Sequence, residues 1–207
     1  MKKLLIATTN PGKLAEIKEF LSDVPLTLVN LSDVGIVDAV EETGITFEEN
    51  AVLKAKHYAK ESDLPTLADD GGLEIDALSG EPGVKSHRWI HKDREDTDEE
   101  LIQYTLDRMK DIVDANRGAQ LRLVLALVLP SGEVFTSEEK VRGIIPRKAS
   151  EYRRKGFPYR SLLFLPEINK YYNHDELTVA ETETYNHRKK ALDILKPILR
   201  LKLTTSV

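Results

Sequence analysis

Apolar positions recur along the chain at two spacings, which predict strands in alternation with helices. An apolar run over residues 1–8 predicts a buried strand, and apolar residues three and four apart over 14–21 predict a helix directly after it. Asn10 can cap that helix, and Pro11 suits its first position, where no N–H is needed. A second strand is expected over 26–31.

Two Thr-x-x-Glu patterns mark the starts of further helices. The pairs Thr46/Glu49 and Thr97/Glu100 have the spacing of a capping box, in which each side chain binds a backbone N–H of the other residue. The helices that they start are expected to end near Lys60 and near Val113. The other expected elements are strands over 66–68, 73–78, 121–129 and 134–145, a turn at Ser131-Gly132, and a last helix from about Tyr185 that Pro197 bends or interrupts.

These elements lack the regular spacing of βαβ units, so they predict a mixed α/β fold rather than a doubly wound parallel sheet. No repeat or linker divides the sequence, and a single domain over 1–207 is expected. The longest apolar run is far shorter than the roughly 18 residues of a membrane span. The chain has no cysteine, which excludes disulfides and zinc-thiolate sites and makes a cytoplasmic location the default.

The charge balance bears on the class of partner. The formal net charge is −5, from 30 basic and 35 acidic residues, which argues against a protein whose main partner is bulk nucleic acid. A small anionic substrate remains compatible with it, provided that a few local lysines and arginines bind it.

The first candidate site is Thr8-Thr9-Asn10-Pro11-Gly12-Lys13, where a strand leads directly into a helix. Free backbone N–H groups and the positive end of the helix dipole favour phosphate at such a junction. The alternative is an ordinary capped helix with a surface lysine. The glycines and the GK[ST] ending of a Walker loop are absent.

The second candidate combines Glu41-Glu42-Thr43-Gly44 with Asp69-Asp70-Gly71-Gly72. One or two carboxylates together with substrate phosphates form a typical magnesium site. Because adjacent residues that leave a strand point to opposite sides, only one of the two aspartates is expected to face a substrate. The alternative interpretation of the Asp-Asp-Gly-Gly segment is a polar turn.

The third candidate lies late in the sequence. It comprises Lys155-Gly156-Phe157-Pro158-Tyr159-Arg160 and Asn186-His187-Arg188. Aromatic rings can stack on a nucleobase, and His and Arg can donate to its oxygen edge. The alternative is a hydrophobic loop beside a surface helix.

In this order the three candidates resemble the inosine triphosphate pyrophosphatase family, also called non-canonical purine NTP pyrophosphatases. The shared motifs are Ala7-Thr8-Thr9-Asn10-Pro11-Gly12-Lys13, Glu41-Glu42-Thr43-Gly44-Ile45-Thr46-Phe47-Glu48-Glu49-Asn50-Ala51, Lys54-Ala55-Lys56, Ala68-Asp69-Asp70, Gly72-Leu73 and Pro82-Gly83-Val84-Lys85-Ser86-His87-Arg88. The resemblance implies an elongated mixed sheet with flanking helices, two lobes around a substrate cleft, and a homodimer. It also implies hydrolysis of ITP, dITP or XTP to a monophosphate and pyrophosphate, which removes these nucleotides before their incorporation.

The same resemblance implies the roles of individual residues. Asp70 would be the general base and a Mg²⁺ ligand, with Glu41 as a second metal ligand and Asp69 in a supporting position. The residues that it implies for substrate binding are Thr8, Thr9, Asn10, Pro11, Gly12, Lys13, Lys54, Phe157, Tyr159, His187 and Arg188.

The chain departs from the family pattern at five positions. Pro158, Arg160 and Ser161 replace a glycine, an aspartate and a proline of the Gly-Phe-Gly-Tyr-Asp-Pro motif, Thr182 replaces a lysine, and Gly71 replaces a serine. If Arg160 and Thr182 face the base, the pocket has lost an acceptor and gained a donor, which predicts a shifted or relaxed base preference. Two alternatives stay open: the same reaction with another base preference, and a nucleotide-binding protein without turnover.

Overall fold

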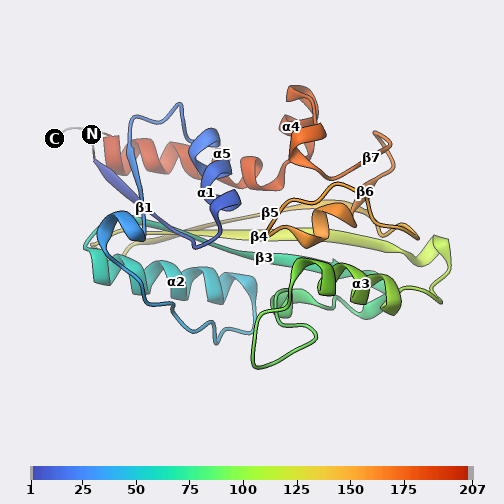
Figure 1. Ribbon diagram of the computed structural model, residues 1–207. Coiled ribbons are helices and arrows are strands. Elements are labelled where there is room, and N and C mark those ends of the chain that lie inside the picture. Colours follow the sequence, from blue (N-terminus) through green and yellow to red (C-terminus); the bar gives the residue numbers. More distant parts are fainter. Residues whose placement is uncertain (1, 205–207) are drawn as a thin grey trace. The chain divides into compact units, whose positions relative to one another are not determined.

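The computed structural model describes residues 2–204, and these form a mixed α/β fold (Figure 1). The seven strands are β1 (Lys3–Ala7), β2 (Thr27–Asn30), β3 (Thr66–Ile75), β4 (Gly118–Val128), β5 (Val134–Ile144), β6 (Phe164–Leu165) and β7 (Lys170–Tyr171). They form one sheet in the order β2-β1-β3-β4-β5-β6-β7. β1 pairs in parallel with β2 and β3, whereas β6 pairs antiparallel with β5 and β7. The prediction of a mixed sheet is therefore confirmed.

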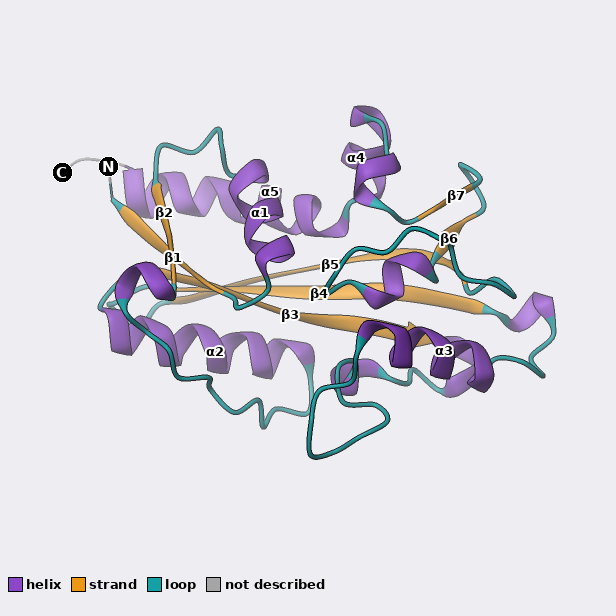
Figure 2. Cartoon of the chain, in the orientation of Figure 1, coloured by secondary structure: helices purple, strands orange, loops and turns teal. Residues whose placement is uncertain are grey.

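Within residues 2–204, three α-helices each connect two strands and two more follow the last strand, and β3, β4 and β5 are the long strands of the sheet (Figure 2). The helices are α1 (Pro11–Phe20), α2 (Phe47–Ser62), α3 (Asp98–Arg108), α4 (Val179–Tyr185) and α5 (His187–Leu199). Among the described residues, no helix is long and apolar enough to cross a membrane.

The chain divides into two compact units. Unit 1 comprises 1–70, 123–139 and 188–207, and unit 2 comprises 71–122 and 140–187. β3, β4 and β5 each contribute residues to both units.

Unit 1 has a hydrophobic layer on each face of its strands. On one face Leu67 packs with Ile17 of α1 and Leu195 of α5. On the other face Ala68 packs with Ala51 and Ala55 of α2. The two layers follow from the alternation of side chains along a strand, so β3 has to present successive residues to different helices.

Unit 2 has a single core. Leu73 and Ile75 of β3 pack with Leu101 of α3, and Tyr159 and Tyr172 complete the same cluster. All five side chains are almost entirely excluded from solvent.

The predicted helix starts are confirmed. The Asn10 side chain accepts hydrogen bonds from the N–H groups of Gly12 and Lys13, with Pro11 in the first turn. Thr46 with Glu49, and Thr97 with Glu100, form complete capping boxes. A cap of this kind stabilises a helix by about 1 kcal/mol.

The predicted end of one helix and the predicted start of another need correction. α3 ends at Arg108 rather than near Val113. The last helix starts at His187 rather than near Tyr185, because Asn186 is extended, with φ −74° and ψ 98°, and separates it from the unpredicted α4. Pro197 lies within α5, which continues past it to Leu199, so the expected interruption of the helix does not occur.

The acidic segment is not a turn. Residues 66–75 form one continuous strand, whereas two short strands with a break were expected. At Gly72 an added Cβ would lie 1.9 Å from Oγ of Ser86, so only glycine lets the strand approach this side chain. The Ser86 hydroxyl accepts the N–H of Leu73 at 3.2 Å and fixes the strand there. Tertiary contact thus overrides the turn preference of Asp and Gly.

Candidate active site

The two adjacent aspartates of β3 lie in different surroundings because the strand alternates. The Asp69 side chain lies on the same face of β3 as Leu67, toward α1 and α5. The Asp70 side chain lies on the same face as Ala68, toward α2. Both residues are buried, with side-chain exposures of 2% for Asp69 and 12% for Asp70. Each therefore requires its own set of partners within unit 1.

Asp70 lies in a group supplied by α2 and by the segment that precedes it. The Lys54 ammonium is 3.6 Å from Oδ1 of Asp70 and 3.1 Å from Oε1 of Glu42. The Asn50 side-chain amide donates to Asp70, and its oxygen accepts the Gly44 N–H at 2.7 Å. Asn50 thus connects the catalytic candidate to the Glu41–Gly44 segment, with its amide orientation fixed by both bonds.

In this group Lys54 does not fully offset the effect of burial on the Asp70 carboxylate. Burial raises the pKa of Asp70, and the nearby Lys54 only partly opposes this effect. Burial disfavours the charged form of Lys54, but the carboxylates of Asp70 and Glu42 outweigh burial and raise the pKa of Lys54. Within residues 2–204, Oδ2 of Asp70 is buried and has no hydrogen-bond partner. Asp70 therefore has an oxygen available for another group.

Asp69 belongs to a second group, on the opposite face of the strand. Its Oδ2 lies 3.0 Å from the Lys13 ammonium and 2.9 Å from Nη1 of Arg188. Nε of Arg188 donates to Oε2 of Glu16 at 3.0 Å. Burial alone would raise the pKa of Asp69, but Lys13 and Arg188 outweigh it and hold this pKa far below the ordinary value. Asp69 is thus a permanent anion, suited to hold cations in place.

The start of α1 differs from the phosphate site that the sequence predicted. The N–H groups of Gly12 and Lys13 are occupied by Oδ1 of Asn10, at 2.9 and 3.2 Å, so they are not free donors. The Thr8 hydroxyl accepts the Asn10 N–H, and Thr9 and Pro11 are exposed. The Lys13 ammonium, which lies 3.0 Å from Asp69, and the exposed Thr9 remain available for a phosphate.

The late aromatic residues lie in unit 2 and are mostly buried. Tyr159 is part of the core, and its hydroxyl donates to the Ser86 carbonyl at 2.5 Å. Burial raises the pKa of Tyr159, so its hydroxyl stays protonated. The structure thus gives Tyr159 a packing position instead of an exposed ring face for stacking.

Phe157 is the least buried of these residues, and a cation covers part of its ring. The guanidinium of the buried Arg160 lies 4.0 Å from the centroid of that ring and 5.5 Å from that of Tyr172. The Tyr172 hydroxyl is 2.7 Å from Nδ1 of His187. Unit 2 therefore brings Phe157, Arg160 and His187 into one cation–aromatic cluster.

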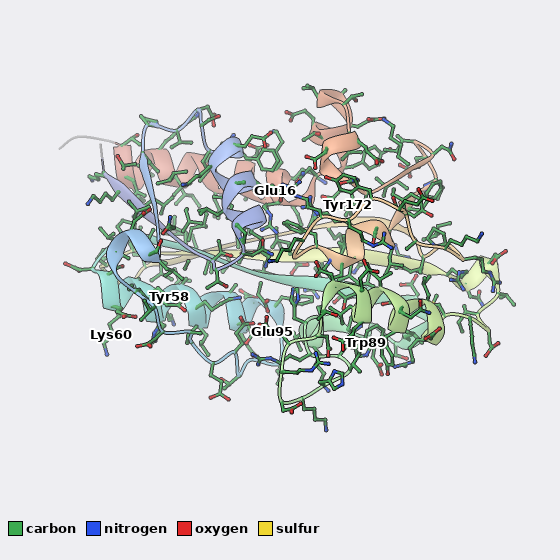
Figure 3. All side chains as sticks on the ribbon, in the orientation of Figure 1. Glu16, Tyr58, Lys60, Trp89, Glu95 and Tyr172 are labelled. Atoms are coloured by element: carbon green, nitrogen blue, oxygen red, sulfur yellow. The ribbon has the colours of Figure 1, made fainter. Side chains whose placement is uncertain are left out.

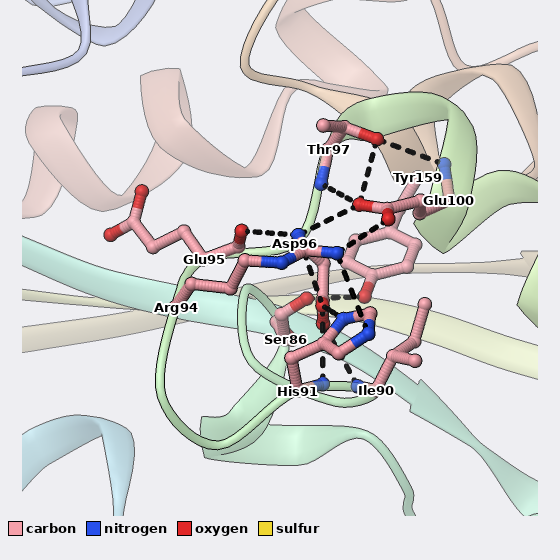
Figure 4. Close-up of polar contacts among 9 residues, drawn as sticks. All are labelled: Ser86, Ile90, His91, Arg94, Glu95, Asp96, Thr97, Glu100 and Tyr159. Carbon is pink, nitrogen blue, oxygen red and sulfur yellow. Dashed lines mark hydrogen bonds and ion pairs between the residues drawn. The ribbon is translucent and has the colours of Figure 1, made fainter.

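A separate polar cluster in unit 2 has ligand types that suit a metal. His91, Asp96 and Glu100 have ligand atoms within 4.8 Å of one another. Arg94, however, binds both oxygens of Glu100, at 2.6 and 3.0 Å, and Asp96 accepts hydrogen bonds from the backbone N–H groups of Ile90 and His91 (Figure 4). Hydrogen bonds from Arg94 and from the N–H and hydroxyl of Thr97 lower the pKa of Glu100 to about 2. The cluster is satisfied by its own cation and braces the loop before α3.

The sequence interpretation missed Glu16 and Asn50 as members of the site. Glu16 falls four residues before Phe20, on the apolar face of α1, and a charge on such a face is unusual enough to indicate a buried partner. Asn50 lies one turn into α2 and had no comparable signal. Glu41, predicted as a metal ligand, is exposed, and it is Glu42 that contacts Lys54.

The chain matches known proteins along nearly its whole length. The model of the Ham1 family matches residues 4–198. The chain belongs to the Ham1 family. A relative from Escherichia coli, named dITP/XTP pyrophosphatase, is 39% identical over 202 residues, which are 97% of this chain and 99% of the relative. A Thermus thermophilus protein of the same name is 42% identical over 196 residues, which are 93% of this chain and 89% of that protein.

Solved Ham1 structures share the fold. The HAM1 protein from Coxiella burnetii superposes with a TM-score of 0.82 at 34% identity, over 97% of this chain and all of that chain. The resemblance found in the sequence motifs is thereby confirmed at the level of both sequence and fold.

Proposed function

We propose that this Ham1 protein is a Mg²⁺-dependent nucleoside triphosphate pyrophosphatase. Water attacks the α-phosphorus, the bond between the α- and β-phosphates breaks, and a nucleoside monophosphate and pyrophosphate leave. Non-canonical purine triphosphates such as dITP and XTP are the default substrates, which would make the protein a sanitiser of the nucleotide pool. The shared name of the Escherichia coli and Thermus thermophilus relatives supports this choice of substrate.

The observation that carries the proposal is the state of Asp70. It is a buried carboxylate with one oxygen unpartnered among the described residues, and Lys54 lies beside its other oxygen. A general base must keep an oxygen free for the proton that it accepts, and its pKa should lie closer to the working pH than that of an exposed aspartate. Burial shifts the pKa of Asp70 in this direction.

The other charged groups suit the demands of the same reaction. Phosphoryl transfer requires positioning and charge neutralisation more than covalent chemistry. Lys54 and Lys13 supply two cations near Asp70, and both affect its pKa. A water held by Asp70 would lose its proton to the carboxylate as the water oxygen attacks phosphorus.

The donor set also fits magnesium. Carboxylate oxygens are the ligands that this hard ion prefers, and Asp70 could bind it through Oδ1, which lies 3.6 Å from the Lys54 ammonium, while Oδ2 stays free for the proton. When bound, Mg²⁺ neutralises phosphate charge and lowers the pKa of water. Glu41 is the second ligand that we propose, since Glu42 is already paired with Lys54, whereas Glu41 has no ion pair within residues 2–204.

Substitution of Glu41 tests the metal site. Glu41→Gln should raise the magnesium concentration for half-maximal activity about tenfold or more, because it removes one anionic ligand. Glu42→Gln is the matched neighbour: it frees Lys54 and should alter KM for the nucleotide while leaving the magnesium requirement nearly unchanged. A magnesium titration that shifts only in the Glu42 variant would assign the ligand to Glu42 instead.

Base preference is a second part of the proposal. The Arg160 guanidinium, 4.0 Å from the Phe157 ring centroid, is the donor that replaces the family's acidic residue. We expect a shifted or relaxed base preference. A donor in place of an acceptor no longer matches the hydrogen-bonding edge of the base that the family's acidic residue suits. If kcat/KM for ITP and XTP still exceeds that for ATP, GTP, CTP, UTP and dTTP by a wide margin, this part is wrong.

One assay tests the function as a whole. Pyrophosphate and orthophosphate release are measured separately for that panel, together with dITP, with and without magnesium. The proposal requires pyrophosphate release that depends on magnesium. Release of orthophosphate alone would indicate cleavage between the β- and γ-phosphates. Nucleotide binding without any release would indicate a nucleotide-binding protein without turnover. The homodimer that the resemblance implies stays a prediction.

A further inference from the structure

Glu16 is a fully buried carboxylate on α1, and no step of the proposed reaction uses it (Figure 3). Its residue exposure is 0%, and it lies on the helix face that carries Ile17 and Phe20 into the core. A buried charge is costly unless it is paired and hydrogen-bonded. A pair of apolar side chains at positions 16 and 188 would fill this space at lower cost, so the charges call for an explanation beyond packing.

The partners of Glu16 form a row of alternating charges that ends at the phosphate candidate. Glu16 accepts from Nε of Arg188 at 3.0 Å, and Nη1 of Arg188 donates to Asp69 at 2.9 Å. The same Asp69 oxygen holds the Lys13 ammonium at 3.0 Å. Side-chain exposure is 0% at Glu16, 4% at Arg188, 2% at Asp69 and 17% at Lys13. The row therefore leads from the core of unit 1 to a partly accessible ammonium.

We propose that Glu16 is a positioning residue that acts through Arg188 and Asp69 to fix Lys13 for the polyphosphate of the substrate. Arg188 then serves the phosphate end of the site, although the sequence had suggested that it donates to the base. With Nε bound to Glu16, the guanidinium cannot rotate away from Asp69, and Asp69 cannot move away from Lys13. The proposal rests on the proposed function for its substrate but can be tested without turnover.

The test uses Glu16→Gln in the full chain. Glutamine keeps the volume and an acceptor oxygen for Nε of Arg188, but it loses the charge that makes this hydrogen bond strong. We expect the dissociation constant for inorganic pyrophosphate, measured by titration calorimetry, to rise about tenfold or more. In turnover, kcat/KM should fall by a common factor for every nucleotide of the panel. The affected contact is with the polyphosphate, which all these nucleotides share, and not with the base.

Control variants separate positioning from simple packing. Glu19→Gln removes a charge from the exposed face of the same helix and should leave pyrophosphate binding unchanged. Lys13→Met should weaken binding as well, and adding Glu16→Gln to it should cause little further loss, since both act on one contact. Should Glu16→Gln fold poorly, Glu16→Gln combined with Arg188→Met removes both charges of that pair and carries the same expectation.

Three outcomes would overturn the proposal. One is an unchanged pyrophosphate affinity with only a lower melting temperature, which would leave Glu16 a purely structural role. Another is a loss of kcat/KM confined to particular bases, which would return Arg188 to base recognition. The third is a wild-type protein that does not bind pyrophosphate. A wild type that binds pyrophosphate but hydrolyses no nucleotide would contradict the proposed function, and the calorimetric comparison would still test Glu16.

Discussion

Asp70→Asn is expected to reduce pyrophosphate release by about 10³-fold or more, because it removes the proposed general base, which is also a proposed magnesium ligand. The fold should survive. Asparagine has nearly the same shape, and Lys54 retains its contact with Glu42 at 3.1 Å. The measurement is pyrophosphate release at saturating nucleotide and magnesium, together with thermal unfolding of both proteins.

The expected effect on stability runs in the opposite direction. Burial raises the pKa of Asp70 above that of an unfolded aspartate, so the ionised carboxylate costs stability at neutral pH. That cost disappears as the pH falls through the folded pKa. Without magnesium, Asp70→Asn should therefore melt at or above the temperature of the wild type, as expected of a residue kept for function.

Asp76→Asn is the matched control for this variant. Asp76 directly follows the end of β3, and its exposed carboxylate pairs with Arg142. Its loss should leave turnover unchanged. Near-normal activity in Asp70→Asn, or a large loss in Asp76→Asn, would overturn the assignment of the catalytic base.

Local sequence signals predicted much of the framework of this site. Asn10 with Pro11 and the Thr46/Glu49 box are short-range patterns, and each defines a helix start within a few residues. α1 and α2 carry Lys13 and Lys54, so these starts also determine which helix supplies which cation. The same pattern at Thr178/Glu181 starts α4, which the sequence interpretation had overlooked.

Long-range contacts account for what could not be predicted. β3 continues through Asp69 and Asp70 because Gly72 fits against Ser86, which lies fourteen residues further along the chain. The partnership of Glu16 with Arg188 joins residues 172 positions apart. A secondary-structure propensity depends on neighbours along the chain. The Gly72–Ser86 contact, by contrast, requires the segment after β3 to fold back on the strand, and the Glu16–Arg188 pair requires α1 and α5 to pack together.

The neighbouring aspartate should respond in the opposite way. Asp69→Asn is expected to lower the free energy of unfolding by about 3 kcal/mol, since it leaves Arg188 and Lys13 without their shared carboxylate in a buried setting. Urea unfolding at neutral pH measures this loss. Asp23→Asn, an exposed carboxylate of unit 1 that also pairs with a lysine and an arginine, is the control and should change stability little.

The pH dependence of this loss has a definite sign. Lys13 and Arg188 hold the pKa of Asp69 far below its unfolded value, so its contribution to stability is fully present above that unfolded value. The contribution falls as the pH drops below about 4, where the unfolded carboxyl takes up a proton and the folded one does not. The stability difference between wild type and Asp69→Asn should therefore shrink on acidification. A difference that is constant from pH 7 to pH 3 would mean that Asp69 stabilises the fold by shape rather than by charge, and Lys13 would then lack the fixed anion on which its placement for phosphate depends.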